Sequence, residues 1–306
     1  MRREKIMIGT STEYPLNGIL TLPETAEGKV PAAVLVHGSG PSDMNEAVGK
    51  LTPFLDIAEG LAARGIASLR YDKRTFAHRR RCMKEKNITI REETIIDAVR
   101  AAELLRSDPR IDPERIFIIG HSMGAMLAPR IDAEGGNFRG LILMAGSLRT
   151  LDEIMISQLE AIESSGGLIG FLTGKQKKKY AAMFSRLQGI SDEEAKNTNL
   201  GGGLTLYYFK EMNAHPAASY LADCEKPVLI LQGEKDFQAT VKDDYASYQK
   251  LLDGRDNVTF RLFPGLDHAF VQAMYDSALK ANKEYGTERH IPDEVIDTIA
   301  RHILQN

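Results

Sequence analysis

Short apolar runs recur along the chain, and between them apolar residues follow helical spacing. Runs without polar interruption are typical of strands buried on both faces of a sheet. Strands that alternate with helices predict an α/β fold, with a mostly parallel sheet and helices packed on both sides. The predicted strands are residues 32–36, 66–69, 116–119, 141–145, 228–231 and 258–263, and the predicted helices are residues 54–63, 94–105, 245–252 and a last helix after Pro292.

The segment before the first buried run has a different pattern. Residues 6–22 alternate more weakly between apolar and polar side chains around Asn17-Gly18. This dipeptide favours a tight hairpin turn, which joins antiparallel strands. We therefore expect an antiparallel edge and a mixed sheet.

The alternation of strands and helices stops between about residues 150 and 224. Helical patterns cover residues 151–162 and 175–187, no buried strand run is present, and apolar side chains are more frequent than in a plain surface loop. We predict a core formed by residues 1–149 and 225–306, with residues 150–224 inserted as a helical lid.

The strongest chemical signal is Gly120-His121-Ser122-Met123-Gly124, directly after a predicted strand and before a helical stretch. This G-x-S-x-G pattern is typical of a nucleophile elbow, a strained strand-to-helix turn that holds the serine hydroxyl above the sheet. The glycines remove side chains that would collide where the backbone folds tightly. We predict Ser122 as a nucleophile, and we expect the neighbouring His121 to point elsewhere.

A serine nucleophile needs a base that takes its proton, and the base needs a carboxylate that fixes its tautomer. His268 follows the last predicted strand, at the carboxyl edge of the sheet where the elbow also lies. Asp236 follows the preceding strand, which gives the chain order Ser, Asp, His. Glu234, Asp243 and Asp244 remain alternative acids, although the last two are expected to face solvent at the start of a helix.

Acyl transfer also needs donors for the tetrahedral oxyanion, usually two backbone amides. Met123 directly follows the nucleophile, and its amide is the first candidate. The second amide is expected in the loop His37-Gly38-Ser39-Gly40-Pro41, from Ser39 or alternatively from Gly40. A dinucleotide-binding turn does not fit this loop, because Pro41 follows and the third glycine is missing.

Composition narrows the class of partner. The formal net charge of −3 over 306 residues gives no field that would attract nucleic acid or an anionic membrane, so we expect a small-molecule ester or acyl substrate. Two cysteines, no signal-peptide pattern and no run long enough to span a bilayer predict a cytoplasmic protein without stable membrane anchoring. Without H-E-x-x-H or G-K-[ST] motifs, neither a metal nor a cofactor is expected.

A basic cluster lies between a predicted strand and the next helix. It could attract an anionic substrate or partner, or form a solvated loop, and the solvated loop is the favoured interpretation. Its members are Lys73, Arg74, His78, Arg79, Arg80, Arg81, Lys84 and Lys86.

Five motifs together resemble those of bacterial α/β-hydrolases of the carboxylesterase and serine aminopeptidase-like groups. The resemblance covers nearly the whole chain and implies a Ser122–Asp236–His268 triad with oxyanion amides from Ser39 and Met123. The motifs are His37-Gly38-Ser39-Gly40-Pro41, Arg70-Tyr71-Asp72-Lys73-Arg74, Gly120-His121-Ser122-Met123-Gly124, Gln232-Gly233-Glu234-Lys235-Asp236 and Gly265-Leu266-Asp267-His268.

The expected activity is therefore hydrolysis of carboxylic esters through an acyl-enzyme intermediate. The alternatives are a peptidase or acyl-amide hydrolase, a thioesterase and, more distantly, a ligand-binding module without catalysis. An aminopeptidase would need lid carboxylates that hold an ammonium group, and the candidates are Glu153, Glu160 and Glu211.

The lid is expected to shape the substrate pocket. Ligands of such sheets bind beyond the carboxyl edge of the strands, where the insertion emerges. Aromatic and methionine side chains would give this pocket an adaptable apolar wall. Phe184, Tyr207 and Met212 are the candidate pocket residues.

Overall fold

The protein is built around one mixed sheet of eight strands. A computed structural model describes residues 1–25, 28–85, 87–164, 166–275 and 280–306. The strand order is β1-β2-β4-β3-β5-β6-β9-β10; β1 and β2 run antiparallel to their neighbours and the remaining pairs are parallel. The mostly parallel sheet with an antiparallel edge is thus confirmed. The sheet strands are β1 (Arg2–Ile8), β2 (Leu16–Leu22), β3 (Val30–Val36), β4 (Ala67–Tyr71), β5 (Ile111–His121), β6 (Leu141–Met144), β9 (Val228–Gly233) and β10 (Val258–Phe263).

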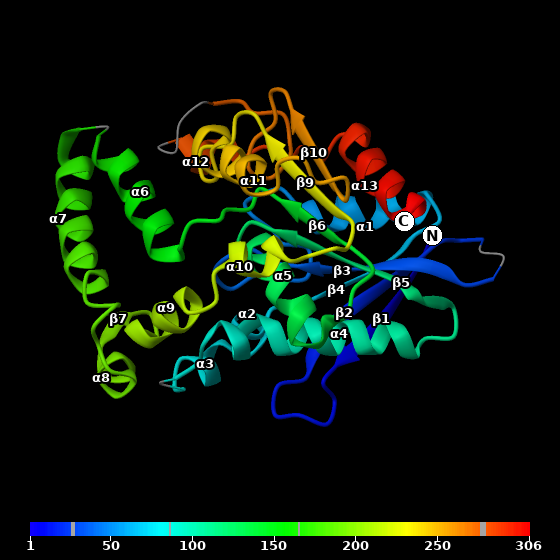
Figure 1. The fold of residues 1–306 in the computed structure, drawn as a ribbon, viewed down its shortest axis with the longest axis horizontal. Helices are drawn as coiled ribbons and strands as arrows, with labels where there is room; N and C mark the ends of the chain where they lie inside the picture. Colours follow the sequence, from blue (N-terminus) through cyan, green and yellow to red (C-terminus); the bar gives the residue numbers. More distant parts are fainter. Residues whose placement is uncertain (26–27, 86, 165, 276–279) are drawn as a thin grey trace.

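Helices cover both faces of the sheet (Figure 1). One face packs against α1 and α13, and the other packs against α4, α5 and α11. Short π-helical segments precede α4 and α11 and follow α5. The helices outside the lid are α1 (Pro53–Ala63), α2 (Arg74–Ala77), α3 (Arg79–Cys82), α4 (Ile96–Ser107), α5 (Met123–Ile131), α11 (Ala246–Leu251), α12 (Ala281–Glu284) and α13 (Asp293–Gln305), and the π-helical segments are η1 (Arg91–Ile95), η2 (Asp132–Gly136) and η3 (Val241–Tyr245).

The uninterrupted apolar runs exist because each central strand contributes to two cores. In β3, Ala33 and Leu35 belong to the core beneath α1 and α13, whereas Val34 and Val36 belong to the core on the other face. Side chains alternate between faces along a strand, so both sets of positions must be apolar. The two cores therefore account for the uninterrupted apolar run of β3.

The expected hairpin turn at Asn17-Gly18 is wrong. Both residues lie inside β2, where Met7 pairs with Asn17 and Ile6 with Gly18. A Cβ at position 18 would stand 2.9 Å from the carbonyl oxygen of Arg70 and 2.9 Å from the Ile6 side chain. Gly18 therefore serves close packing between strands rather than a turn.

The segment between β6 and β9 is mostly helical. Helices α6 and α7 pack on each other and extend away from the sheet, whereas α9 and α10 return to the core (Figure 1). A short antiparallel pair, β7 with β8, was not predicted because strands of two or three residues leave no periodic signal. The elements of the insertion are α6 (Leu151–Glu163), α7 (Gly167–Phe184), α8 (Asp192–Asn197), β7 (Asn199–Gly201), β8 (Leu204–Thr205), α9 (Leu206–Asn213) and α10 (Ala217–Ala222).

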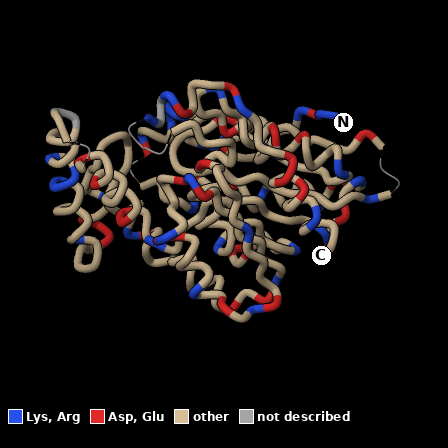
Figure 2. The backbone as a smooth tube through the Cα atoms, turned by 90° about the horizontal axis from the view of Figure 1, so that it is seen from above, with Lys and Arg blue, Asp and Glu red and all other residues tan. Residues whose placement is uncertain are grey.

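The basic cluster does not form one solvated loop. Lys73 and Arg74 are buried, and their side chains pair with Glu93 at 3.2 Å and Asp97 at 2.7 Å. The solvated interpretation fits the exposed arginines of α3, whereas Lys86 lies outside the described residues. Figure 2 shows Lys and Arg interspersed with Asp and Glu along the backbone. Among the described helices, none is long and apolar enough to cross a membrane.

Candidate active site

Ser122 occupies a sharp turn between β5 and α5. Its backbone has φ 54° and ψ −118°, a left-handed conformation that strains a residue with a side chain. A Cβ on Gly120 would lie 2.3 Å from the Gly124 carbonyl oxygen, and a Cβ on Gly124 would lie 2.1 Å from the Val36 carbonyl oxygen. The G-x-S-x-G spacing thus follows from packing, because only glycine lets the turn press against β3.

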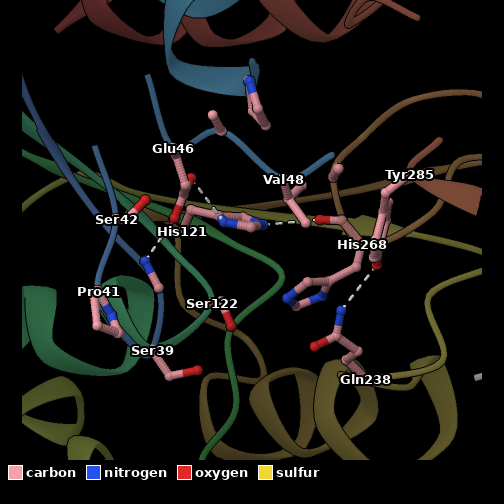
Figure 3. A pocket seen from close by; sticks show the side chains of 14 residues that line it. Ser39, Pro41, Ser42, Glu46, Val48, His121, Ser122, Gln238, His268 and Tyr285 are labelled. Atoms are coloured by element: carbon pink, nitrogen blue, oxygen red, sulfur yellow. Dashed lines mark hydrogen bonds and ion pairs between the residues drawn. The ribbon is translucent and has the colours of Figure 1, made fainter. Parts of the chain in front are cut away.

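Asp236 and His268 lie together at the carboxyl ends of β9 and β10. The Nδ1 atom of His268 lies 2.7 Å from Oδ2 of Asp236. A carboxylate oxygen accepts, so Nδ1 donates and Nε2 remains free to take a proton. Ser122 and His268 line the same pocket, and their side chains face each other in Figure 3.

Asp236 is held by three further donors. Its Oδ1 atom accepts from the backbone amides of Gln238 at 2.7 Å and Ala239 at 3.0 Å, and its Oδ2 atom accepts from the Gln232 side chain at 3.1 Å. Several donors hold a carboxylate in one orientation. This arrangement fixes the position of the carboxylate that His268 contacts.

The alternative carboxylates lie in other surroundings. Glu234 is exposed and accepts from the Gly265 amide at 3.0 Å, and Asp243 is exposed at the start of η3. The expectation that Asp244 faces solvent is wrong, because it is buried and pairs with Arg149 at 2.8 Å. Burial at this position depends on the loop after β6, which is distant in sequence.

The loop after β3 approaches the serine closely. A Cβ on Gly38 would lie 3.1 Å from the Ser122 Cβ, so a side chain there would crowd the nucleophile. Ser39 lines the pocket that contains Ser122 (Figure 3). Met123 is the first residue of α5, where amides have no partner within the helix. Both predicted oxyanion donors therefore belong to segments that flank the serine.

Two cavities open beside these residues and share Pro41. The first has a volume of about 230 Å³ and contains Ser122 and His268. The second has a volume of about 290 Å³ and lies between the Pro41 loop, α3 and the lid. Its described lining is Gly40, Pro41, Thr75, Arg79, Cys82, Met83, Ile88, Glu93, Gly202, Gly203, Leu204 and Tyr208.

The three lid residues proposed from sequence are not among the described residues that line these two cavities. Phe184 and Met212 are buried in the core between the lid and the sheet. Tyr207 lies under the ammonium group of Lys196, 4.5 Å from its ring centroid. The neighbouring Tyr208 instead reaches the second cavity, where its hydroxyl group donates to Glu93.

Sequence reasoning did not place His121 and Glu46 at the first cavity, although both line it. His121 does not point away, because it lines this cavity and its ring centroid lies 4.8 Å from that of His268. Glu46, in the loop before α1, lies opposite His121 (Figure 3). The position of His121 beside the serine was the available signal, whereas no local pattern marked Glu46.

Comparisons with known proteins agree with this architecture. The sequence model of the alpha/beta hydrolase family matches residues 33–279. The chain is similar to Esterase EstD of Thermotoga maritima, with 34% identity over 290 residues, which is 95% of this chain and 66% of that protein. The chain thus spans slightly less than two thirds of the relative's length.

Several solved structures are also similar in fold. Est1E of Butyrivibrio proteoclasticus has a TM-score of 0.56 at 14% identity, with 99% of both chains covered. An esterase of Pyrococcus furiosus has a TM-score of 0.59 at 14% identity, covering 99% of this chain and 91% of that one. An acylaminoacyl peptidase of Pyrococcus horikoshii has a TM-score of 0.56 at 15% identity, covering 98% and 41%. Because this fold hosts both esterases and a peptidase, it does not by itself identify the substrate.

Proposed function

Because the chain belongs to the alpha/beta hydrolase family, we propose that it is a serine hydrolase that cleaves carboxylic esters through an acyl-enzyme intermediate. In this proposal Ser122 is the nucleophile, His268 the general base and Asp236 the carboxylate that orients it. The observation that carries the proposal is the 2.7 Å contact from Asp236 to Nδ1 of His268, beside a serine on a strained turn. Such a contact fixes the tautomer that a serine nucleophile requires.

The reaction would proceed in two steps, acylation of Ser122 and hydrolysis of the acyl-enzyme. As the Ser122 hydroxyl oxygen attacks the ester carbonyl carbon, its proton passes to Nε2 of His268. The tetrahedral oxyanion would accept hydrogen bonds from the amides of Ser39 and Met123. When the intermediate collapses, His268 returns the proton to the leaving alcohol. Water then attacks the acyl-enzyme by the same route, releasing the acid and restoring the serine.

An ester substrate is favoured over an aminoacyl amide by the state of the lid carboxylates. Glu211 pairs with Arg130 at 2.5 Å, and Glu160 lies 3.3 Å from Lys177. Glu153 accepts from the backbone amide of Thr150 in a helix cap. These three carboxylates are engaged within the protein and are absent from the described linings of both cavities. The similarity to an esterase supports the same substrate class.

The larger group of the substrate would occupy the second cavity. This cavity meets the first at Pro41, and part of its lining is apolar, including Met83, Ile88 and Leu204. Apolar cavities with a few polar groups are suited to small organic ligands. The lid contributes Leu204 and Tyr208 directly, whereas Phe184, Tyr207 and Met212 would act only by supporting them.

The decisive experiment compares the native chain with Ser122→Ala. Both are incubated with a fluorophosphonate and with a panel of p-nitrophenyl esters, thioesters and aminoacyl amides. The native chain should be labelled once and should hydrolyse esters fastest, while Ser122→Ala should lose both properties and keep its Tm within a few degrees. Full labelling of the variant would move the nucleophile elsewhere, and faster amide turnover would make the protein an amide hydrolase.

A further inference from the structure

His121 connects the serine turn to the loop that bears His268. The residue is 8% exposed, and its Nε2 atom lies 2.8 Å from the backbone carbonyl oxygen of His268. A carbonyl oxygen only accepts, so Nε2 of His121 carries a hydrogen and donates it. The contact acts on the backbone of the catalytic histidine, which leaves the His268 ring free for Asp236 and Ser122.

Glu46 connects the same histidine to the loop after β3, residues 37–41, which we call the oxyanion loop because it contains Ser39. Its Oε2 atom lies 3.0 Å from Nδ1 of His121, and its Oε1 atom accepts from the Gly38 amide at 2.6 Å. The backbone of Glu46 has φ 52°, a conformation that is unfavourable for a residue with a side chain. A strained glutamate that bridges two functional loops indicates that its side chain is needed there.

The pair is charged near neutral pH. Burial alone would lower the pKa of His121, but the Glu46 carboxylate outweighs it and raises that pKa to about 9. Burial would raise the pKa of Glu46, but the His121 imidazolium lowers it below its ordinary value. Asp236 also favours the imidazolium, whereas burial keeps the nearby His37 neutral by lowering its pKa to about 4.

The contacts of His121 and Glu46 connect two loops that are not neighbours at the edge of the sheet. The oxyanion loop follows β3 and the His268 loop follows β10, and three strands, β5, β6 and β9, lie between them in the sheet. Hydrogen bonds between neighbouring strands therefore do not set the spacing of these two loops directly. A misplacement of about 1 Å in an active site costs about 100-fold in rate.

We propose that His121 and Glu46 form a positioning pair that holds the oxyanion loop in register with the His268 loop. The inference rests on the proposed function. The continuous path runs from the His268 carbonyl through His121 and Glu46 to the Gly38 amide. The Lys73 ammonium group donates to the Gly38 carbonyl oxygen at 2.9 Å. Neither member of the pair exchanges a proton with the substrate.

Two substitutions of Glu46 separate position from charge. Glu46→Ala removes both contacts and should lower kcat by about 30- to 100-fold with KM changed less than about threefold, since oxyanion donors act in the transition state. Glu46→Gln can keep the geometry: its oxygen still accepts from Gly38, and its amide donates to a neutral His121. The fold decrease in kcat for Glu46→Gln should be less than about a fifth of the fold decrease for Glu46→Ala, as expected if Glu46 acts by positioning the two loops.

The matched control is Asp56→Ala. Asp56 of α1 pairs with His290 at 2.9 Å and is not among the described residues that line the first cavity. The variant therefore removes a carboxylate–histidine pair that is not part of this cavity. Its turnover should stay within twofold of the native value. All rates are divided by the number of sites that a fluorophosphonate titrates, so a partly unfolded sample does not appear as slow catalysis.

A double substitution completes the test. If the two residues act as one unit, Glu46→Ala with His121→Ala should be no slower than the slower single variant. The inference is overturned if Glu46→Ala turns over within threefold of the native chain, if Glu46→Gln is as slow as Glu46→Ala, or if the single losses multiply. If the native chain itself hydrolyses no ester and takes no fluorophosphonate label, the proposed function fails instead.

Discussion

Asp236→Asn is the substitution whose outcome the structure specifies most fully. The new amide can place its oxygen in either of two positions. If the oxygen stays at Oδ1, it keeps both backbone donors, Gln238 and Ala239, and the NH2 group faces His268. If the amide flips, the NH2 group faces the two backbone donors instead. Gln232 does not reverse this choice, because its side chain also donates to the Ala239 carbonyl at 2.7 Å.

The first orientation should predominate strongly. The flipped amide would leave two backbone N–H groups unpaired, that of Ala239 buried and that of Gln238 partly buried. An unpaired buried N–H group costs about 1–3 kcal/mol. A difference of about 2 kcal/mol already leaves only about one molecule in thirty flipped. In the predominant form the NH2 group donates to Nδ1, so Nε2 of His268 carries the hydrogen and no longer accepts one. The loss of imidazolium stabilisation adds to this, and kcat should fall by about 10³- to 10⁴-fold, or about 4–5.5 kcal/mol.

Ester turnover per titrated active site measures this effect. Asp243→Asn is the control, because Asp243 is an exposed aspartate in η3, the segment that follows β9 along the chain. It should retain at least about half of native turnover, as expected for a surface substitution. Turnover of Asp236→Asn within tenfold of native would refute the reasoning and would move the orienting role to another carboxylate.

Three further predictions concern pH, stability and substrate size. The pKa of His121, at about 9, lies above its ordinary value of 6.5, so the stability that its protonation contributes is complete below about pH 6.5 and is lost as pH rises through about 9. In calorimetry, the difference in Tm between the native chain and Glu46→Gln should therefore shrink between pH 7 and 10. A difference that stays constant over this range would contradict the prediction. Asp244→Ala should lower the free energy of unfolding by about 3 kcal/mol in urea titrations, because it removes a buried carboxylate that pairs with Arg149. Turnover per folded molecule should stay near native, since Asp244 is not among the described residues that line the first cavity. Leu204→Trp should fill the second cavity and so reduce kcat/KM for bulky esters about tenfold relative to kcat/KM for acetate esters. The control is Leu262→Trp on the exposed edge of the sheet, which should leave the ratio of these two kcat/KM values unchanged.

Much of the fold could be predicted from local pattern. The strand in which Ala33 to Val36 alternate between two cores must be apolar throughout, so its burial is readable without knowledge of its neighbours. The elbow at Ser122 is equally local, because its two glycines are required within five residues. The order of strands then places Asp236 and His268 at the same sheet edge, which is why chain order and strand ends were enough to propose them together.

Other features depended on residues that are distant in sequence. Gly18 looks like a turn residue, yet its role is set by Arg70 and Ile6, which press on it from the two adjacent strands. Asp244 looks solvent-facing until Arg149 covers it. Turn propensity amounts to only a few tenths of a kcal/mol to about 1 kcal/mol per residue, and tertiary burial readily outweighs it.

Glu46 is the clearest case of what only the tertiary structure decided. No periodicity marks it, and alone it would be an ordinary acidic residue in a loop. It becomes a buried partner of His121 because β3 and β5 lie side by side and deliver both residues to one pocket. The charge of each then depends on the other, since burial without a counterion would neutralise both. The sequence specifies these residues, but only the folded chain brings their charges within 3.0 Å.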